Sequence, residues 1–395
     1  MKINKRNPKH WLALAAFFVQ GMLGLLLRIL HPGRRGGQTV IFYGHKLNGN
    51  LLALYLFMQE HPECQLRPVF LTMDGDYLRE LEAKGVQVCL AGGWACAGLL
   101  GRACAMVSDH GLHSLQPLLG AYQRLGLRFF DVWHGIPFKG FDQQDFRLQR
   151  RYEETWVASA LCRDLYISRF GFEPARVQVT GYPRTDRLVQ RTHEDIRSQR
   201  TALGLPAQGR LILFAPTWAQ DAKWRNIYPF GHSESEFLQT LSALAARHGA
   251  TILLRSHLNS GNVDGGSNLP PGIVPLPGAR YPDAEGILLI SDVLVCDWSS
   301  IAFDYLLLER PTIFLEVSPP FRKGFSLGPE YRFGPVVADM PALLQQLEIC
   351  LTTPGAYWSA YGERHRTTLQ KVYGALPDGL ASQRCIERLR DAVAR

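Results

Sequence analysis

Cysteine is scarce and scattered in this sequence. The chain of 395 residues has eight cysteines, and no two of them form a CxxC pair. Structural zinc sites and disulfide frameworks use cysteines at close or regular spacings, so the sequence argues against both. A reducing cytoplasm is therefore the compartment that fits best. The sequence also has no internal repeat.

Long basic runs and nucleotide-binding signatures are missing as well. No five Lys or Arg residues stand in a row and no nucleic-acid motif occurs, so we expect no nucleic acid partner. Neither GxxxxGK[ST] nor GxGxxG follows an expected strand. The net charge is nevertheless +8, which suits an anionic membrane surface or a phosphate-rich substrate. At 46% hydrophobic residues the chain can bury a large core, and its length favours two domains.

One segment departs from this soluble composition. Trp11–Leu27 carries no charge, with Lys9 before it and Arg28 after it. It is at the low edge of length for a membrane span, and no small-residue cleavage site of a secretory signal follows it. We expect a helix in or on the inner leaflet, which makes the protein peripheral or monotopic at the cytoplasmic face of the cell membrane. The alternative is a hydrophobic helix packed on the protein body.

The rest of the chain alternates between short apolar strands and helices. Thr39–Tyr43 and Leu66–Thr72 are expected strands, with a helix at Leu51–Glu60 between them. A second series of this kind begins near Arg210. Such alternation predicts an α/β protein with two doubly wound, Rossmann-like domains that face each other across a cleft, a GT-B-like architecture.

Composition also predicts the domain limits. By residue number we expect a hydrophobic membrane-associated helix and linker (1–36), an N-terminal Rossmann-like domain (37–200), a C-terminal Rossmann-like domain (201–350) and C-terminal helices (351–395). A return of the last helices to the N-terminal domain is one option. Asn259–Pro277 is rich in Gly, Asn and Pro and is expected to be a long loop, and Gly286–Ile290 to end a helix.

The most informative stretch is Ser291–Leu315, which reads SDVLVCDWSSIAFDYLLLERPTIFL. It is an apolar strand, a loop with Asp297, Ser299 and Ser300, a helix, and a second apolar strand after Pro311. Free N–H groups lie at a helix start, where the helix dipole is positive. Two hydroxyls at such a turn predict a phosphate-binding site at the carboxyl end of a strand.

Polar side chains follow the other expected strands too. They are His134, Gly135 and Lys139 after Phe129–Val132, Arg184 and Asp186 in a Gly-Tyr-Pro turn, Thr217 after Leu211–Ala215, and Arg255 and His257 at the end of the expected strand Thr251–Arg255. A neutral histidine can take the proton of a hydroxyl nucleophile because its pKa lies near working pH. Cationic side chains and helix-start N–H groups would position a phosphate and stabilise its charge. The pattern therefore predicts group transfer onto a hydroxyl.

These motifs occur in a definite order. They are WHG-x-P-x-K, GYPR-x-D, APTW, R-x-H, and SD-x-L-x-x-D-x-SS-x-x-FD followed by RP, and together they cover roughly Phe42–Val337. The set resembles the CDP-glycerol glycerophosphotransferase family of teichoic-acid-type polymerases and primases. The resemblance implies a GT-B fold and a CDP-glycerol or CDP-ribitol donor. It also implies transfer of an alditol phosphate, usually glycerol phosphate, to a hydroxyl of a glycan or lipid-linked acceptor, with release of CMP and no further cofactor.

The resemblance also assigns roles to residues of this chain. His134 matches the histidine that the family uses as general base, and His257 matches the histidine associated with the donor phosphates. Ser299 and Ser300 match the serine pair that binds the donor diphosphate. The other expected donor-binding residues are Gly135, Lys139, Arg184, Asp186, Thr217, Arg255, Asp297 and Asp304.

The sequence departs from the family pattern at two places. Trp298 stands where the family more often has a tyrosine. The end motif, often Arg-Gly-Phe followed by Leu-Pro-Gly-Pro, reads Lys-Gly-Phe at 323–325 and Arg-Phe-Gly-Pro at 332–335. These departures bear on the acceptor or the alditol rather than on the class of reaction.

Two further motifs have structural explanations. Asp74-Gly75-Asp76 has the DxD form of metal-dependent transferases, but an Asp-Gly turn explains it, and we predict no metal ion held by protein ligands. The segment around Ser233 nearly matches a hydrolase elbow but lacks its final glycine. We expect Ser233 to cap the helix after it.

Two other functions stay open at this stage. A GT-B glycosyltransferase with a nucleotide-sugar donor would use a similar diphosphate site and would release a nucleoside diphosphate. A non-catalytic membrane scaffold could retain the fold, although both histidines and the serine pair argue against it. The sequence does not indicate the oligomeric state.

Overall fold

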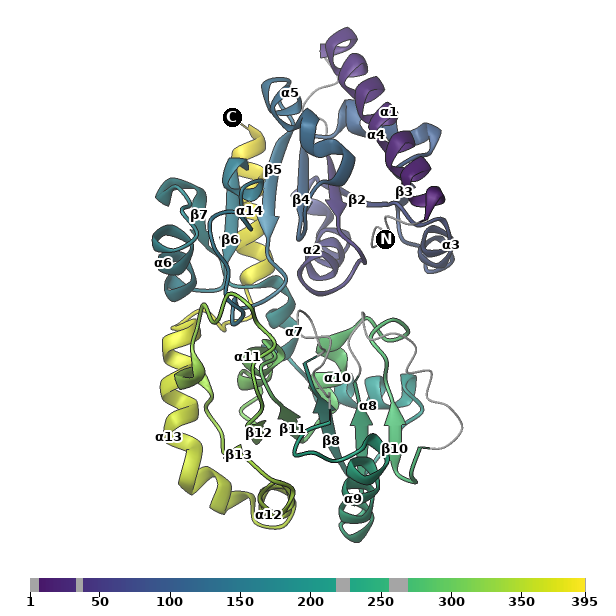
Figure 1. Cartoon of the computed structure of the whole chain (residues 1–395). Helices are drawn as coiled ribbons and strands as arrows, with labels where there is room; N and C mark the ends of the chain where they lie inside the picture. The colour runs from purple at the N-terminus through teal and green to yellow at the C-terminus, as the bar shows by residue number, and fades with distance from the viewer. Residues whose placement is uncertain (1–6, 33–37, 218–227, 256–268, 395) are drawn as a thin grey trace. The chain divides into compact units, whose positions relative to one another are not determined.

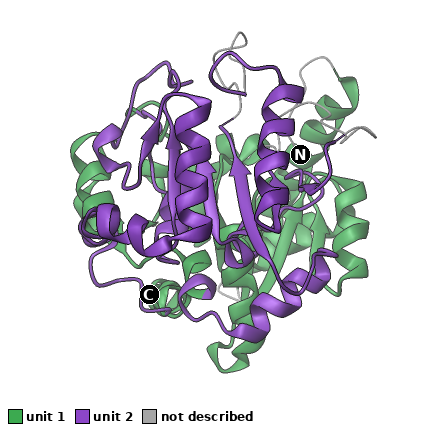
Figure 2. Ribbon diagram, turned by 90° about the horizontal axis from the view of Figure 1, so that it is seen from below, with its two compact units in different colours: residues 1–134, 142–186, 380–395 green, residues 135–141, 187–379 purple. Residues whose placement is uncertain are grey.

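The chain forms two compact units, which do not correspond to simple halves of the sequence. The computed structural model describes residues 7–32, 38–217, 228–255 and 269–394 (Figure 1). Unit 1 contains residues 1–134, 142–186 and 380–395, and unit 2 contains residues 135–141 and 187–379 (Figure 2). The chain therefore passes from one unit to the other after His134, Phe141, Asp186 and Gly379.

Unit 1 is built on a seven-stranded parallel sheet with the order β3-β2-β1-β4-β5-β6-β7. Its strands are β1 Thr39–Tyr43, β2 Arg67–Thr72, β3 Val88–Leu90, β4 Ala105–Ser108, β5 Arg128–Val132, β6 Glu154–Val157 and β7 Val177–Val179. The β-branched and aromatic residues of β1 favour extended backbone. The strand order reverses between β1 and β4, as in a doubly wound sheet.

Helices cover both faces of this sheet. They are α1 Pro8–Leu30, α2 Gly49–Glu60, α3 Gly75–Ala83, α4 Trp94–Arg102, α5 Leu119–Arg124, α6 Ala160–Ser168 and α14 Ala381–Ala394, with short 3₁₀ turns at η2 Pro62–Cys64, η3 His113–Leu118, η4 Gln149–Arg151, η5 Pro174–Arg176 and η6 Pro183–Thr185. Helix α3 begins at the DxD segment, because the Asp74 carboxylate accepts the amides of Asp76 and Tyr77 as an N-cap.

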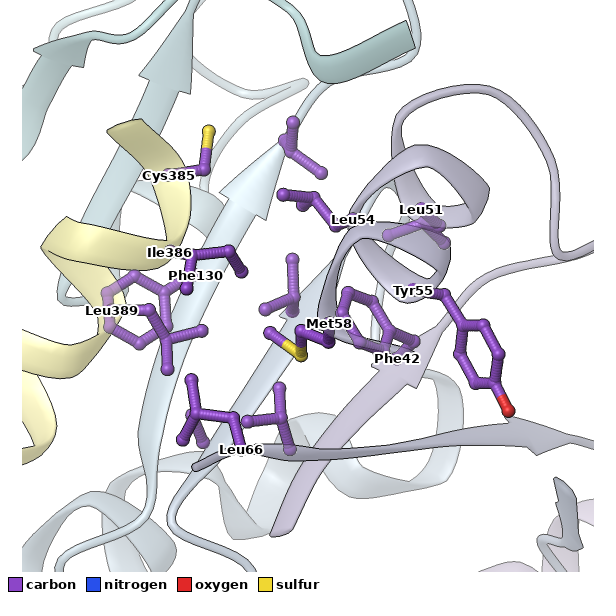
Figure 3. Close-up of a cluster of buried hydrophobic side chains, with 14 of the residues drawn as sticks. Phe42, Leu51, Leu54, Tyr55, Met58, Leu66, Phe130, Cys385, Ile386 and Leu389 are labelled. Carbon is purple, nitrogen blue, oxygen red and sulfur yellow. The ribbon is translucent and has the colours of Figure 1, made fainter. Parts of the chain in front are cut away.

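Alternate residues of β1 point to opposite faces of the sheet. Val40 and Phe42 belong to a core cluster with α2 and α14, and Ile41 and Tyr43 belong to a second cluster under α1 and α4. Figure 3 shows the first cluster, in which side chains of α2 and of the C-terminal helix α14 meet over β1 and β5. Unit 1 therefore includes the last helix of the chain in its core.

Helix α1 packs lengthwise on α4, and the two helices lie side by side (Figure 1). Small residues allow this close approach: a Cβ added to Gly24 would lie 2.8 Å from the Cβ of Leu100. Gln20 of α1 is buried and accepts a hydrogen bond from the amide of Ala97 at 3.2 Å. The packing therefore includes a polar contact as well as apolar ones.

Arg28 fastens the last turn of α1 to the same surface. It has no exposed area, and its guanidinium donates hydrogen bonds to the carbonyls of Leu100, Ala103 and Leu125 at 3.1, 2.7 and 3.0 Å. These carbonyls lie at the end of α4 and just after α5, where backbone acceptors lack helical partners. A buried cation with this many acceptors makes α1 a fixed part of unit 1.

The outer face of α1 is apolar and exposed. Among the described residues, α1 is the helix long and apolar enough to cross a membrane, judged by length and composition. Its exposed large apolar residues are Trp11, Leu12, Phe18, Val19, Met22, Leu23, Leu26, Ile29 and Leu30. Trp94, at the start of α4, is 93% exposed. The alternative of packing on the body is therefore realised on one face of α1, while the other face keeps the character that a membrane-associated helix requires.

Unit 2 contains a six-stranded parallel sheet with the order β10-β9-β8-β11-β12-β13. Its strands are β8 Arg210–Ala215, β9 Ala250–Leu254, β10 Ile273–Pro275, β11 Val293–Cys296, β12 Thr312–Leu315 and β13 Val336–Val337. Strand β10 corrects the prediction of a loop throughout Asn259–Pro277, since this short edge strand pairs with β9. At an edge, a proline needs no ladder partner for its missing N–H.

The helices of unit 2 are α7 Asp186–Val189, which begins at the unit boundary, α8 His193–Ala202, α9 Glu234–Arg247, α10 Ala284–Ile290, α11 Ile301–Leu306, α12 Met340–Thr352 and α13 Pro354–Tyr373, with a 3₁₀ turn at η7 Pro329–Tyr331. The predicted cap of α9 is confirmed. The Ser233 side chain accepts the amide of Glu236, whose carboxylate accepts the amide of Ser233 in return.

Candidate active site

Each sheet has one point where its strand order reverses. In unit 1 this point lies between β1 and β4, and in unit 2 between β8 and β11. Ligands of doubly wound sheets bind beyond the carboxyl ends of the strands at such switch points. Most of the residues singled out from the sequence follow these strands or their immediate neighbours.

In unit 1, His134 follows β5 and its main chain is held from two sides. The Asn50 side chain of α2 donates to the carbonyl of Trp133 at 2.7 Å, and the Arg184 guanidinium donates to the carbonyl of His134 at 2.7 Å. Asn50 also accepts the amide of Arg184 at 3.1 Å. Arg184 is 9% exposed, so in this structure it positions the histidine loop from within the protein.

The ring of His134 has a defined proton arrangement. Its Nδ1 lies 3.3 Å from the main-chain carbonyl of Asp109, and a carbonyl can only accept, so Nδ1 carries the proton. Nε2 is then the unprotonated nitrogen. The His134 side chain is exposed, so Nε2 belongs to a ring that a substrate can reach. This is the tautomer and the access that a general base needs.

Burial, followed by the charge of His110, lowers the pKa of His134 to about 4. Because part of the ring is exposed, water that reaches it will reduce the desolvation and moderate this lowering. In either case the His134 imidazole is neutral at pH 7, the form that can accept a proton.

Three further histidines form a row of rings that ends at His134, and none of them was predicted from the sequence as a site residue. His45 follows β1, and His110 and His113 follow β4. The rings form a chain with centroid distances of 5.7 Å from His113 to His45, 4.3 Å from His45 to His110 and 4.9 Å from His110 to His134. Their shared signal is a histidine soon after an apolar strand, which the sequence shows at all these positions.

A buried carboxyl lies behind this cluster. Asp131 of β5 has no exposed area, and within the described residues neither of its carboxyl oxygens finds a hydrogen-bond donor. Its neighbours in register are Ser108 of β4 and Thr155 of β6. Burial raises the pKa of Asp131 well above its ordinary value, with a smaller contribution from Asp109. Burial therefore favours the protonated, neutral form of the Asp131 carboxyl.

We predict that Asp131→Asn stabilises the protein relative to wild type increasingly as pH rises. The folded-state pKa of Asp131 lies above its unfolded value of about 4, so wild-type stability declines as pH increases above that value. Asparagine cannot ionise and removes this decline. Thermal unfolding at pH 5 and pH 8 checks the prediction, with the exposed Asp391→Asn as control. Equal temperature differences at both pH values would contradict it.

In unit 2, the strand, turn and helix predicted around the serine pair are present. Strand β11 ends at Cys296, and α11 begins at Ile301. Ser299 and Ser300 are half-buried in the turn between them, and Ser299 Oγ accepts the amide of Ile301 at 3.4 Å. Helix α11 is short, so an anion at this turn would be held by the hydroxyls and the local N–H groups rather than by a long helix dipole.

Asp297 and Thr217 join the two central strands of unit 2 at this turn. One carboxylate oxygen of Asp297, Oδ1, accepts both the amide of Thr217 at 2.8 Å and its hydroxyl at 2.5 Å. Asp297 is 1% exposed and Thr217 is 7% exposed. The pair therefore acts on the turn that carries the serines by fixing the end of β11 against the end of β8.

Other predicted residues of unit 2 lie near these strand ends or in the segment that enters from unit 1. Arg255 follows β9, and its guanidinium donates to the carbonyl of Tyr281 at 3.0 Å. Burial lowers the pKa of Arg255, while Glu285 and Asp283 oppose this. Gly135 and Lys139 belong to the 135–141 segment, where Lys139 bridges to Phe325, and Asp304 is buried on α11.

Asp186 has a partner that the sequence did not suggest. Its carboxylate accepts the amides of Ala381 and Ser382 at 2.9 and 2.7 Å, at the start of α14. Burial raises the pKa of Asp186, and the hydrogen bonds from these residues oppose the rise. In this structure Asp186 holds the last helix in unit 1, whereas His257 lies outside the described residues.

Comparison with known proteins assigns this chain to a family. The family model described as CDP-Glycerol:Poly(glycerophosphate) glycerophosphotransferase matches residues 34–391. The chain belongs to this family. It is therefore an enzyme of the CDP-glycerol glycerophosphotransferase class, as the motifs indicated.

Individual relatives agree with this assignment. The chain is 27% identical over 384 residues to a teichoic acid glycerol-phosphate transferase of Staphylococcus aureus (strain NCTC 8325 / PS 47), covering 88% of this chain and 91% of that protein. It is 26% identical over 309 residues to a teichoic acid poly(glycerol phosphate) polymerase of Bacillus subtilis (strain 168), covering 70% of this chain and 38% of the polymerase. A solved structure of the wall teichoic acid polymerase TagF superposes with a TM-score of 0.73 at 21% identity, over 95% of this chain and 94% of the other. The predicted GT-B-like α/β fold is confirmed.

The departures from the family pattern lie together in unit 2. The ring of Trp298 lies 4.8 Å from that of Phe325, and the Arg332 guanidinium lies 4.2 Å from the centroid of Trp298. Arg332 also forms an ion pair with Glu316 at 2.9 Å. Phe138, from the segment that follows His134, packs on both aromatic rings. Trp298 and Arg332, which differ from the pattern at separate sequence positions, thus pack together beside the serine turn.

Proposed function

We propose that this enzyme transfers an alditol phosphate, most readily glycerol phosphate, from a CDP-alditol to a hydroxyl of a glycan or lipid-linked polymer, with release of CMP. The product would be a cell-surface polymer of the teichoic-acid type. Family membership supports the class of donor, and the two relatives named above are described as a glycerol-phosphate transferase and a poly(glycerol phosphate) polymerase. Other relatives are described as ribitol-phosphate polymerases, so CDP-ribitol is the second donor to test.

The observation that carries the proposal is the state of His134. It is a neutral, accessible imidazole whose Nδ1 proton is directed to a main-chain carbonyl, which leaves Nε2 free to accept a proton. Transfer of a phosphoryl group to a hydroxyl needs this kind of acceptor and otherwise depends on positioning and charge stabilisation.

The reaction then proceeds by displacement at phosphorus. The acceptor hydroxyl attacks the β-phosphorus of the CDP-alditol, and His134 Nε2 takes the hydroxyl proton. A new P–O bond forms to the acceptor, and the bond between the β-phosphorus and the bridging oxygen breaks. CMP leaves with that oxygen, so atoms and charge balance.

The donor side of the reaction is assigned to unit 2. The Ser299 and Ser300 hydroxyls and the N–H groups of their turn are suited to hold the diphosphate. Asp297 is positioned to support the turn rather than the anion, since a carboxylate would repel phosphate and its Oδ1 is already engaged by Thr217. We assign His257 and Arg255 to donor binding on the resemblance alone.

A product assay tests the proposal directly. The purified full-length protein is given CDP-glycerol, CDP-ribitol or a nucleotide-sugar donor, together with a lipid-linked or glycan acceptor, and the products are measured by mass spectrometry. We expect CMP and an acceptor heavier by one or more alditol phosphates. Release of a nucleoside diphosphate from a nucleotide sugar would instead establish a glycosyltransferase. Lack of turnover and of calorimetric binding with both CDP-alditols would favour a scaffold.

We also propose that the outer face of α1 lies in the cytoplasmic leaflet of the membrane, and that the protein is monotopic. The apolar residues of that face point away from unit 1, and the exposed Trp94 of α4 extends the surface. The inner face is occupied by α4, and Arg28 is enclosed by protein. A helix with one side bound to the protein and one side apolar suits the plane of an interface better than a span.

We predict that the double substitution Leu23→Glu and Leu26→Glu abolishes binding to vesicles. Both side chains are exposed on α1, at 41% and 48%, and carboxylates there would be costly to place in an anionic leaflet. Co-sedimentation with phosphatidylglycerol-containing vesicles measures the effect. Leu56→Glu is the matched control, because Leu56 is 42% exposed on α2, which covers the other face of the sheet. Undiminished sedimentation of the double variant would exclude this face as the membrane contact.

A further inference from the structure

We propose that Asp109 and His110 form a second functional pair in unit 1: the main-chain carbonyl of Asp109 fixes the base-competent tautomer of His134, and His110 is a positioning residue whose stacked ring disfavours protonation of His134. The inference rests on the proposed function of His134 as general base. It adds two residues to the site and a reason for the pH range in which the base works.

Asp109 holds two imidazoles at once. Its carboxylate accepts the Nδ1–H of His110 at 2.6 Å, and its main-chain carbonyl accepts the Nδ1–H of His134 at 3.3 Å. The ring of His110 is stacked on that of His134, with centroids 4.9 Å apart and planes inclined by 9°. The position of one residue at the end of β4 therefore fixes the orientation of both rings.

The local packing is built around this carboxylate. The Asp109 side chain is 7% exposed. A Cβ added to Gly44 would lie 2.6 Å from its Oδ1 and 2.7 Å from Leu51 Cδ1, so only a glycine at the end of β1 lets the carboxylate approach this closely. The close approach of the end of β1 to the Asp109 side chain therefore requires a glycine at position 44.

Among the four histidines of the cluster, His110 is the one whose surroundings favour the protonated form. Burial alone would lower the pKa of His110, but the charge and hydrogen bond of Asp109 outweigh it, and the net pKa is raised. Burial lowers the pKa of His45 to about 3 and that of His113 to about 4, so both are neutral at pH 7. The Nδ1 of His113 is also hydrogen-bonded to the hydroxyl of Tyr43 at 2.6 Å.

When His110 is protonated, its charge, stacked on His134, opposes a second positive charge on that ring. The other groups that face His134 act in known directions. Arg184, bonded to the His134 carbonyl, also disfavours protonation, and the Asp109 carboxylate favours it. Burial of Asp131 raises its pKa and so favours its neutral form. Among these neighbours of His134, His110 is the one whose gain or loss of a proton changes the charge next to the His134 ring.

A metal site is the obvious other reading of several histidines. Within the described residues no group of three or more His, Cys, Asp or Glu side chains is arranged to hold a metal ion. The rings of His110 and His134 stack face to face, and Nδ1 of each is already bonded to Asp109. The arrangement suits control of a proton.

The test uses His110→Gln and Asp109→Asn in the full-length protein, with His61→Gln as control. His61 is an imidazole of unit 1 bonded to a main-chain carbonyl, that of Phe57 at the end of α2, on the opposite edge of the sheet. Histidine NMR titration of the free protein measures the pKa of His134 without any substrate. We expect the His134 pKa to rise by about one pH unit in His110→Gln and to stay unchanged in the control. In Asp109→Asn the rise should be smaller, because that variant also loses the carboxylate that favours protonation of His134.

The pH dependence of kcat/KM should shift in the same direction as the pKa of His134. In His110→Gln the acid limb of the kcat/KM profile should move to higher pH by about one unit, so that activity falls up to about tenfold on the acid side and is retained at pH 8. The double variant should match Asp109→Asn, because both lack the carboxylate and a charged His110. Loss of activity by the same factor at every pH in His110→Gln, or a higher KM for the acceptor with an unshifted profile, would overturn the proposal. An unchanged pKa of His134 in His110→Gln would overturn it as well. A shifted pKa in a protein that transfers nothing from CDP-alditols would leave this inference intact and refute the proposed function.

Discussion

Replacement of His134 by alanine is expected to reduce turnover by about a hundred- to ten-thousandfold, the usual contribution of a general base. The affinity for CDP-glycerol should change little, because the donor is assigned to unit 2 and the base acts on the acceptor hydroxyl. Steady-state kinetics with CDP-glycerol, together with calorimetric titration of the donor, separates the two quantities. A fall in kcat with constant donor affinity identifies an interaction that is made only in the transition state.

The control for this variant is His61→Ala, which removes an imidazole of the same unit from the opposite edge of the sheet. It should keep wild-type turnover. If His134→Ala retains turnover within a few-fold of wild type, His134 is not the base. If turnover falls only because donor binding is lost, His134 belongs to the donor site instead. Either result would leave the family assignment and the fold unaffected.

The sequence was sufficient to predict the elements that carry the site. The apolar strands of both sheets alternate with amphipathic segments, so β1, β5, β8, β9 and β11 were expected where they occur. The turn with Ser299 and Ser300 could also be predicted, because a strand, a polar loop and a helix follow one another within one short segment. Local pattern is enough when the residues of a feature are neighbours in the chain.

Features that depend on strand order could not be predicted in the same way. His45, His110 and His134 meet because β1, β4 and β5 are adjacent in the sheet, and this adjacency is not present in any local pattern. The partner of Asp186 lies on the last helix of the chain, far from Asp186 in the sequence. No local pattern indicated this structural role, so the Asp186 carboxylate was assigned to the donor from its motif. Strand β10 was missed because its composition is that of a loop and its pairing with β9 decides its structure.

Arg28 of α1 is a second residue whose surroundings could not be predicted from the local sequence, and the error affects how the whole helix is placed. Arg28 looked like a flanking cation of a hydrophobic segment, suited to lipid headgroups. The structure instead encloses it completely, with carbonyls of Leu100, Ala103 and Leu125 as acceptors. A hydropathy profile places an arginine at the boundary of an apolar segment, because the side chain is charged. Here three buried carbonyl acceptors compensate the charge and allow Arg28 to lie in the interior.

Replacement of Arg28 by methionine is therefore expected to destabilise unit 1 by about 2–4 kcal/mol, since buried carbonyls lose their donors. Hydrogen exchange should show earlier opening of α1, and urea unfolding should shift to lower concentration. Arg102→Met, at the exposed end of α4, is the control and should change stability by no more than about 0.5 kcal/mol. A helix that merely crossed or lay on a membrane apart from the protein would not transmit the substitution to the body. Equal unfolding curves for Arg28→Met and wild type would thus contradict the docked helix and, with it, the argument that α1 presents only one face to the lipid.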